Sequence, residues 1–399
     1  MSEWEMVRIP DVLFFQEGPG VRNHQYVSNG IKLLNVANLQ EGKVDLTTSA
    51  RYISEEEAYG KYKHFLVDEG DFIIASSGIK VEYFERKMGF INKEHLPLCM
   101  NTSTIRFKTL DNKILLTKFF MYYLKTDEFK MQLSKQIVGS AQLNFGPSHL
   151  KKMKIPLPPL EKQQEIAEEL DNITELIALR KHQLEKLDLL VKAKFVEMFG
   201  DPVENPMGWE VGTIRDVVDS VKYGTSQPAT ENGRYTYLRM NNITYEGRLD
   251  LSQVKYIDMV EKDYEKYVAR KNDVLFNRTN SKELVGKTCV FNCSTEMILA
   301  GYIIRIRTNN KILPMYLSTV LNSKYGKQTL YGMCKSIVGQ ANINAQELQG
   351  IGILIPPLPL QEQFAHYVQT VEQTRNQMEQ GLEKLEQLYR ERMQRWFGG

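Results

Sequence analysis

Residues 155–167 read IPLPPLEKQQEIA, and residues 353–365 read ILIPPLPLQEQFA. Both segments place a pair of prolines before a polar, amphipathic run. Proline is tolerated in the first turn of a helix but disrupts its interior, so each pair predicts a helix start. Because Gln163 and Gln361 follow their prolines at the same distance, the two segments look like copies of one structural device.

Four further pairs of segments match in the same order along the chain. The offset between copies falls from 205 residues at Trp4 and Trp209 to 198 residues at the proline segments. The matched segments are Trp4-Glu5 with Trp209-Glu210, 33–46 with 238–251, 69–78 with 271–280, and 134–145 with 334–345. This order predicts two tandem copies of a mixed α/β domain, each followed by a long helix. The predicted segments are 1–155 and 201–355 for the domains, and 156–200 and 356–399 for the helices.

The two helical segments carry apolar residues at alternating spacings of four and three, which is typical of a helix that packs along one face. We call these positions the seam. In the first helix the seam is Ile166, Leu170, Ile173, Ile177, Leu184, Leu187 and Val191; in the second it is Phe364, Val368, Val371, Met378, Leu382, Leu385 and Tyr389. Gly200 and Gly398 mark the predicted ends. Each run of about 40 residues corresponds to a helix of roughly 60 Å, which needs a partner for its seam.

The simplest partner for each helix is the other copy. We expect an antiparallel coiled coil with an internal pseudo-two-fold repeat, in preference to a parallel pair, and an α+β fold class for the whole chain. Charged residues interrupt the seam, and they face either the sister helix or partner subunits: Arg180, Lys194, Arg375 and Arg392. Apolar residues off the first seam cover either the domains or helices of other subunits: Leu160, Leu176, Leu179, Leu189, Leu190 and Phe195.

The overall composition excludes several classes of protein. The formal net charge of the 399 residues is only +2, so any nucleic-acid binding must rest on local patches. No apolar run approaches 18 residues, and the first ten residues lack the apolar core of a secretory signal, which favours a cytoplasmic protein without membrane spans. Cys289 and Cys293 lie close together but lack a second ligand pair, so zinc is not expected.

The sequence offers no catalytic motif. It lacks a glycine-rich dinucleotide fingerprint and the NPPF or DPPY motifs of amino-methyltransferases. The stretch VGKT at residues 285–288 resembles the end of a phosphate-binding loop, but Ser281 stands where the opening glycine belongs. We therefore predict no catalytic site, no metal site and no cofactor in this chain.

Polar residues instead follow the predicted strands in both copies. Asn, Gln, Arg and Lys side chains can read base edges, while Ser and Thr can bind phosphates. The candidate DNA-binding residues are Ser76, Ser77, Lys80, Gln142 and Asn144 in the first copy, and Asn277, Arg278, Thr279, Asn280, Lys282, Lys287, Asn342 and Asn344 in the second. For any one of these residues, a simple role in forming a turn is the competing interpretation.

Two diverged halves, each ending in a PPLxxQ-led helix with IVGSAQLNF or IVGQANINA upstream, resemble the specificity subunit of a type I restriction-modification enzyme. The resemblance covers essentially the whole chain. It implies two target recognition domains that read a bipartite site in double-stranded DNA, and helices that set the spacing and dock two modification subunits. It also implies that S-adenosylmethionine binds those subunits, which methylate adenine, and that ATP and Mg bind the restriction (motor-nuclease) subunits. In that family the specificity subunit is not catalytic.

Two other functions remain as alternatives. A coiled-coil scaffold with two protein-binding modules would bind its partners with little salt dependence, whereas DNA binding weakens steeply with salt. An enzyme in its own right would need a convergent set of titratable groups, which the repeats do not share.

Overall fold

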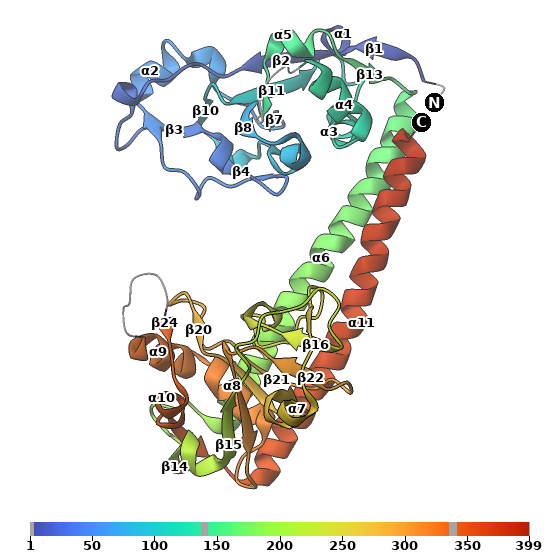
Figure 1. Cartoon of the computed structure of the whole chain (residues 1–399). Coiled ribbons are helices and arrows are strands. Elements are labelled where there is room, and N and C mark those ends of the chain that lie inside the picture. The colour runs from blue at the N-terminus through green and yellow to red at the C-terminus, as the bar shows by residue number, and fades with distance from the viewer. Residues whose placement is uncertain (1–3, 137–142, 335–340, 399) are drawn as a thin grey trace. The chain divides into compact units, whose positions relative to one another are not determined.

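The structure is a computed structural model that describes residues 4–136, 143–334 and 341–398 (Figure 1). The chain divides into two compact units. Unit 1 comprises Met1–Leu179 and Leu382–Gly399, and unit 2 comprises Arg180–Gly381. Each unit therefore contains one globular part and segments of two long helices.

A four-stranded antiparallel sheet forms the centre of unit 1. Its strands lie in the order β2 (Leu13–Glu17), β11 (Thr104–Thr109), β7 (Phe72–Ala75) and β9 (Met88–Phe90). All four residues of β7 are buried, as expected for a strand that is covered on both faces. Helix α3 (Thr117–Leu124) packs against the sheet, with the rings of Phe120 and Phe107 5.0 Å apart.

Smaller elements complete unit 1. A three-stranded sheet has the order β10 (Leu98–Met100), β3 (Ile31–Leu34) and β6 (Tyr52–Ile53), and β4 (Leu39–Gln40) pairs with β5 (Lys43–Val44). Two further pairs are β1 (Met6–Arg8) with β13 (Lys154–Pro156), and β8 (Ser77–Ile79) with β12 (Leu143–Asn144). The other α-helices are α1 (Ile9–Val12), α2 (Glu55–Tyr59), α4 (Asp127–Gln136) and α5 (Pro147–Leu150).

Unit 2 repeats the central sheet and the two outlying strand pairs of this plan, but its second sheet has four strands where that of unit 1 has three. Its central sheet has the order β15 (Val218–Tyr223), β23 (Ile303–Thr308), β19 (Val274–Asn277) and β21 (Thr288–Val290). Its second sheet has the order β17 (Lys255–Ile257), β16 (Tyr235–Leu238), β22 (Met297–Leu299) and β18 (Val268–Ala269). The pairs are β14 (Glu210–Thr213) with β25 (Gly352–Ile355), and β20 (Thr279–Asn280) with β24 (Ala341–Asn342). The helices are α7 (Glu261–Tyr267), α8 (Pro314–Asn322), α9 (Lys324–Met333) and α10 (Ala345–Gln349). The predicted tandem repeat of a mixed α/β domain is confirmed.

Both predicted long helices are present. Helix α6 spans Leu160–Phe199 and α11 spans Leu358–Phe397, so each has 40 residues. Gly200 follows α6 with φ of 77°, a left-handed conformation that glycine adopts without strain at a helix end. Among the described residues, none of the helices is long and apolar enough to cross a membrane.

The glutamine of each proline segment fastens its helix to the adjoining domain. Gln163 accepts a hydrogen bond from the Leu116 amide at 2.9 Å and donates to the carbonyls of Ile114 and Pro158. Gln361 accepts from the Leu313 amide at 2.8 Å and donates to two carbonyls in the same way. Both glutamines are fully buried, and these bonds satisfy the buried polar groups.

The helix contacts within each unit show an antiparallel pair. In unit 1, Glu169 near the start of α6 accepts a 2.7 Å hydrogen bond from the indole of Trp396 near the end of α11. In unit 2, Phe195 near the end of α6 lies 5.6 Å from Phe364 near the start of α11. Figure 1 shows the two helices side by side. The predicted antiparallel coiled coil is confirmed.

The seam residues are buried or half-buried throughout. The charged residues that interrupt the seam turn toward the sister helix. Arg375 donates to Asp188 at 2.6 Å, and Arg392 lies 3.1 Å from Glu169. The guanidinium of Arg180 lies over Gly381, where a Cβ would meet it at 2.9 Å. The charges of Arg375 and Arg392 are thus matched by carboxylates across the helix pair, whereas Lys194 pairs with Glu197 of its own helix.

The apolar residues off the first seam divide into two groups. Phe195 is buried among the aromatic residues of unit 2, and Leu160 is half-buried. Four leucines on α6 stay about half exposed: Leu176, Leu179, Leu189 and Leu190. Packing on the domains explains Phe195 but does not cover these four.

Candidate DNA interface

The structure places the two predicted polar loops of each copy side by side. In unit 2, β20 and β24 form an antiparallel ladder in which Thr279 pairs with Asn342. In unit 1, β8 and β12 form the matching ladder, with Asn144 paired to Ser77. Segments more than 60 residues apart in sequence therefore converge at one place in each copy.

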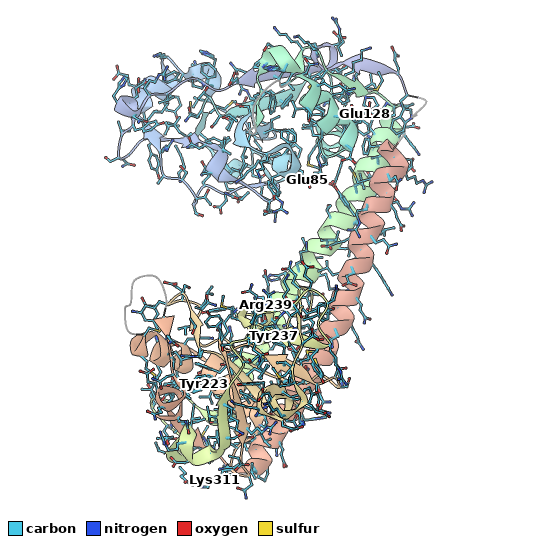
Figure 2. All side chains as sticks on the ribbon, in the orientation of Figure 1. Glu85, Glu128, Tyr223, Tyr237, Arg239 and Lys311 are labelled. Carbon is cyan, nitrogen blue, oxygen red and sulfur yellow. The ribbon has the colours of Figure 1, made fainter. Side chains whose placement is uncertain are left out.

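The unit 2 ladder gathers side chains that can recognise DNA bases. The Arg278 Nε donates to the Asn342 Oδ1 at 3.2 Å, and the Thr279 hydroxyl lies 3.3 Å from the same oxygen. The guanidinium of Arg278 lies 4.7 Å from the ring centre of Tyr223, whose hydroxyl accepts from the Ala345 amide at 2.8 Å. Figure 2 labels Tyr223 in unit 2. A stacked, partly exposed guanidinium retains free donors that can bind guanine O6 and N7.

Other predicted residues surround this ladder in more ordinary roles. Lys282 lies 4.1 Å from the ring centre of Tyr331, which is half exposed. The Asn280 side chain accepts from the next backbone amide, and Asn344 caps α10 by accepting from two amides at 2.9 Å. For these two asparagines the alternative role in local backbone geometry is visible.

Three predicted residues lie inside the protein. Ser76 is 1% exposed, Asn277 is 0% exposed and Lys287 is 8% exposed. The Lys287 ammonium donates to the carbonyl of Met240 at 3.0 Å, and burial lowers its pKa. Burial excludes direct contact between these three side chains and base edges in this structure. The sequence pattern did not distinguish these residues from their neighbours, because the residues at a strand end alternate between the interior and the surface.

The remaining candidates belong to unit 1. Ser77 is half-buried in β8, and Lys80 is exposed just after this strand. Asn144 lies in β12, and Gln142 falls outside the described residues. Lys80 is therefore the predicted residue that places a positive charge on the surface next to the unit 1 ladder.

The sequence prediction missed the aromatic partners of the cationic side chains. Tyr223 lies beneath Arg278 and Tyr331 beneath Lys282, although each pair is separated by about 50 residues of sequence. Cation–π contacts of this kind hold a charged side chain in place while leaving it accessible. The spacing of residues in the sequence does not predict these pairs, because they form only when the sheet assembles.

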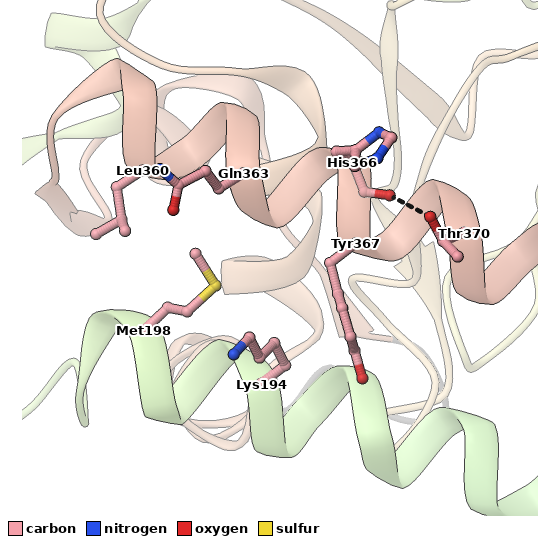
Figure 3. Close-up of a pocket in the computed structure, with 7 residues that line it drawn as sticks. All are labelled: Lys194, Met198, Leu360, Gln363, His366, Tyr367 and Thr370. Atoms are coloured by element: carbon pink, nitrogen blue, oxygen red, sulfur yellow. Dashed lines mark hydrogen bonds between the residues drawn. The ribbon is translucent and has the colours of Figure 1, made fainter.

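A cavity lies between the long helices of unit 2 (Figure 3). Its volume is about 470 Å³, and it is lined by Lys194, Met198, Leu360, Gln363, His366, Tyr367 and Thr370. Lys194 binds Glu197 of its own helix at 2.6 Å and lies 5.9 Å from the ring centre of Tyr367. The charge of Lys194 is thus paired beside this cavity.

The described residues contain no cluster of three or more His, Cys, Asp or Glu side chains that could hold a metal ion. The chemistry that is present consists of hydrogen-bond donors, amides and cations at the strand ends. This arrangement suits recognition of a polyanion.

The chain belongs to the family defined by the type I restriction modification DNA specificity domain, whose model matches residues 1–189 and 206–387. The two matches correspond to the two copies seen in the structure. The chain is thus a type I restriction-modification specificity subunit with two recognition domains.

Individual relatives agree with this assignment. The specificity subunit of the type I restriction enzyme EcoKI from Escherichia coli K12 is 22% identical over 370 residues, which are 87% of this chain and 78% of that protein. The MjaVIII specificity subunit from Methanocaldococcus jannaschii is 30% identical over 192 residues, 47% of this chain and 43% of that protein.

Solved structures show the same fold. The S subunit of a type I restriction-modification system from M. genitalium superposes with a TM-score of 0.56 and 15% identity, over 98% of this chain and 95% of that one. A chain from another type I system structure gives a TM-score of 0.58 and 18% identity, over 100% and 98% of the two chains.

Proposed function

We propose that this chain reads a bipartite sequence in double-stranded DNA, with residues 1–155 reading one part and residues 201–355 the other. The observation that carries this proposal is the β-ladder built once in each copy. In unit 2 the ladder presents Arg278, Thr279 and Asn342 as one hydrogen-bonded group. Because the two ladders differ in side chains, the two copies would read different sequences.

The helices, residues 156–200 and 356–399, would hold the two domains and dock two modification subunits. The half-exposed leucines of α6 support this role, since exposed apolar side chains on a surface helix are those that a partner subunit would bury. The modification subunits would carry S-adenosylmethionine and methylate adenine, and restriction subunits with ATP and Mg would join for cleavage. This chain would supply recognition without catalysis, in the cytoplasm.

Methylome sequencing of the host, with and without this chain, tests the proposal. We expect one bipartite motif with methylated adenine to disappear when the chain is deleted and to return when it is restored. A methylome that does not change would contradict the proposal.

The salt dependence of binding distinguishes the DNA-binding function from the alternative of a protein-binding scaffold. Phosphate contacts release counterions, so DNA binding by the full chain should weaken steeply as salt rises, whereas a protein-binding scaffold would show little change. The partly exposed cations Arg278 and Lys282 favour the DNA function.

A further inference from the structure

Two lysines of unit 2 contact the loop between β16 and β17, which comprises residues 239–254. Lys327, the fourth residue of α9, donates from Nζ to the carbonyl of Gly286 at 3.2 Å and lies 5.1 Å from the ring centre of Tyr245. Lys287 is the next residue after Gly286, and its buried ammonium binds the carbonyl of Met240. Both ammonium groups are therefore held by backbone carbonyls, which are neutral, and the nearby carboxylate of Glu246 offsets only part of their charge.

A third lysine, on α6, lies close enough to act electrostatically on Lys327. Arg248, three residues after Tyr245, forms an ion pair with Asp188 of α6. Lys192 follows Asp188 by four residues, so it lies one turn further along the same helix face. Lys192 is exposed, and its charge acts on Lys327. The loop is thus flanked by lysines from both α6 and α9.

The pKa of Lys327 reflects both its burial and its cationic neighbours. Burial, the charge of Lys287 and the charge of Lys192 lower the pKa of Lys327 to about 8, against the opposing effect of Glu246. Within the described part of the chain, no ion pair joins a carboxylate to any of the three lysines. A site with this excess of cations has a positive potential, which favours an anion.

Unit 1 has lysines at the two corresponding positions, but a carboxylate neutralises one of them. Lys130 is the fourth residue of α4, as Lys327 is of α9, and it forms an ion pair of 2.9 Å with Glu85. Lys87 precedes β9 as Lys287 precedes β21, and it donates to the amide oxygen of Gln40 at 3.1 Å. The same two positions thus carry lysines in both copies, but Glu85 offsets the charge in unit 1.

We infer that Lys327 and Lys192, with the buried charge of Lys287 behind them, bind one phosphodiester group of the DNA backbone. The inference rests on the proposed function and adds a sequence-independent contact to it. An ammonium has three donors, and the one bond of Lys327 to Gly286 leaves two for phosphate oxygens. Such a contact would fix the position of unit 2 on the duplex while the ladder around Arg278 reads bases.

The test compares Lys327→Met with wild type, both as the full-length chain. The probes are a duplex with the methylated motif found in the host and a duplex with the same bases scrambled. We expect Lys327→Met to weaken binding to both duplexes by the same factor, roughly five- to tenfold at about 0.1 M salt. The slope of log affinity against log salt should fall by about 0.9, the value for one phosphate.

Two further variants serve as controls. Lys327→Arg keeps the charge and should keep the wild-type slope. Lys311→Met removes an exposed lysine that is far from the proposed site. Figure 2 shows Lys311 and Arg239 at opposite ends of the globular part of unit 2. Arg239 marks the proposed site, because the next residue, Met240, accepts the hydrogen bond of Lys287. Lys311→Met should leave affinity and slope unchanged. Circular dichroism spectra that match wild type show that the variants are folded.

Each other outcome has a clear meaning. An unchanged slope in folded Lys327→Met overturns the inference, and so does a loss confined to the motif duplex, which would indicate base reading. A calorimetric effect on inorganic phosphate binding without an effect on duplex binding would indicate a small-anion site instead. If wild type does not prefer the motif duplex but Lys327→Met still lowers the slope, the proposed function fails and the phosphate contact stands.

Discussion

Arg375 of α11 donates a 2.6 Å hydrogen bond to Asp188 of α6, and Arg248 from the loop after β16 pairs with the same carboxylate. Arg248 also lies 3.3 Å from Glu372 of α11. One carboxylate thus joins both helices to a loop of the adjoining globular part. Because the Arg375 side chain is only 6% exposed, its charge depends on carboxylate partners, of which Asp188 is nearer than Glu372 at 3.6 Å.

Replacing Asp188 should therefore destabilise unit 2. In Asp188→Asn the buried guanidinium of Arg375 loses its shorter ion pair and keeps only Glu372 at 3.6 Å, so we expect a loss of about 2 kcal/mol in the free energy of unfolding. Urea unfolding followed by circular dichroism measures this change. Glu185→Gln, three residues earlier on the same helix, is the control. The Glu185 side chain is 78% exposed, so losing its charge should change the free energy of unfolding little. Equal midpoints for both variants would contradict the prediction.

Removing either buried glutamine should loosen the joint between a domain and its helix. In Gln361→Leu the Leu313 amide and two carbonyls lose their partners, which costs about 2–3 kcal/mol. We expect faster hydrogen–deuterium exchange in peptides that cover residues 311–316, and Gln163→Leu should do the same for residues 114–119. The exposed Gln363→Leu is the matched control. Unchanged exchange at these peptides would show that the glutamines do not hold the joints.

The large features of the fold were predictable because they depend on periodic patterns. Prolines, seam spacing and a terminal glycine predict each long helix, and the ordered matches predict two copies. The partners of Arg375 and Arg392 were not predictable, because Asp188 and Glu169 are nearly 200 residues or more away from them in sequence. Such pairs are fixed only by the register of the assembled helices.

The candidate site was predictable only as a region. Polar residues after strands marked the loops that became the β-ladders, but the pattern did not tell which side chains point outward. Ser76 and Asn277 continue buried strands and turn inward, while Arg278 and Thr279 lie beside them at the surface. The phosphate site around Lys327 joins α6, α9 and a loop, so only the tertiary structure reveals it.

Changing Arg278 should alter one half of the recognised motif. We expect Arg278→Ala to relax the base preference at one position in the half-site read by unit 2, with a loss of about 1–3 kcal/mol in discrimination. The other half-site and the gap should stay unchanged in the methylome. Arg278→Lys keeps the charge but loses the planar fork, so it should relax the same position. If the lysine variant restores the wild-type motif, Arg278 contacts a phosphate and not a base.

DNA affinity should depend on pH through Lys327. Its pKa of about 8 lies below the ordinary lysine value, so the free protein loses this proton as pH rises through about 8. A bound phosphate stabilises the ammonium, and binding then takes up a proton in this range, which makes affinity fall as pH rises. The groups that face Lys327 are Lys287, Lys192, Glu246 and Tyr245.

Duplex binding at constant ionic strength, from about pH 7 to about pH 9, measures this effect. Wild type should bind with constant affinity below about pH 8 and progressively more weakly above it. Lys327→Arg stays charged across the range and should show no such decline. A decline that persists in the arginine variant would assign the proton to another group.

Shortening the helix pair should change the gap between half-sites without changing their sequences. Four residues near Lys181 would be deleted from α6 together with four facing residues of α11 near Gly381, which lies against Arg180. At 1.5 Å per residue this removes about 6 Å of helix, close to the rise of two base pairs. We expect the methylome to show the same two half-sites with a gap shorter by about two base pairs. A methylated motif with its original gap would show that the helices do not set the spacing.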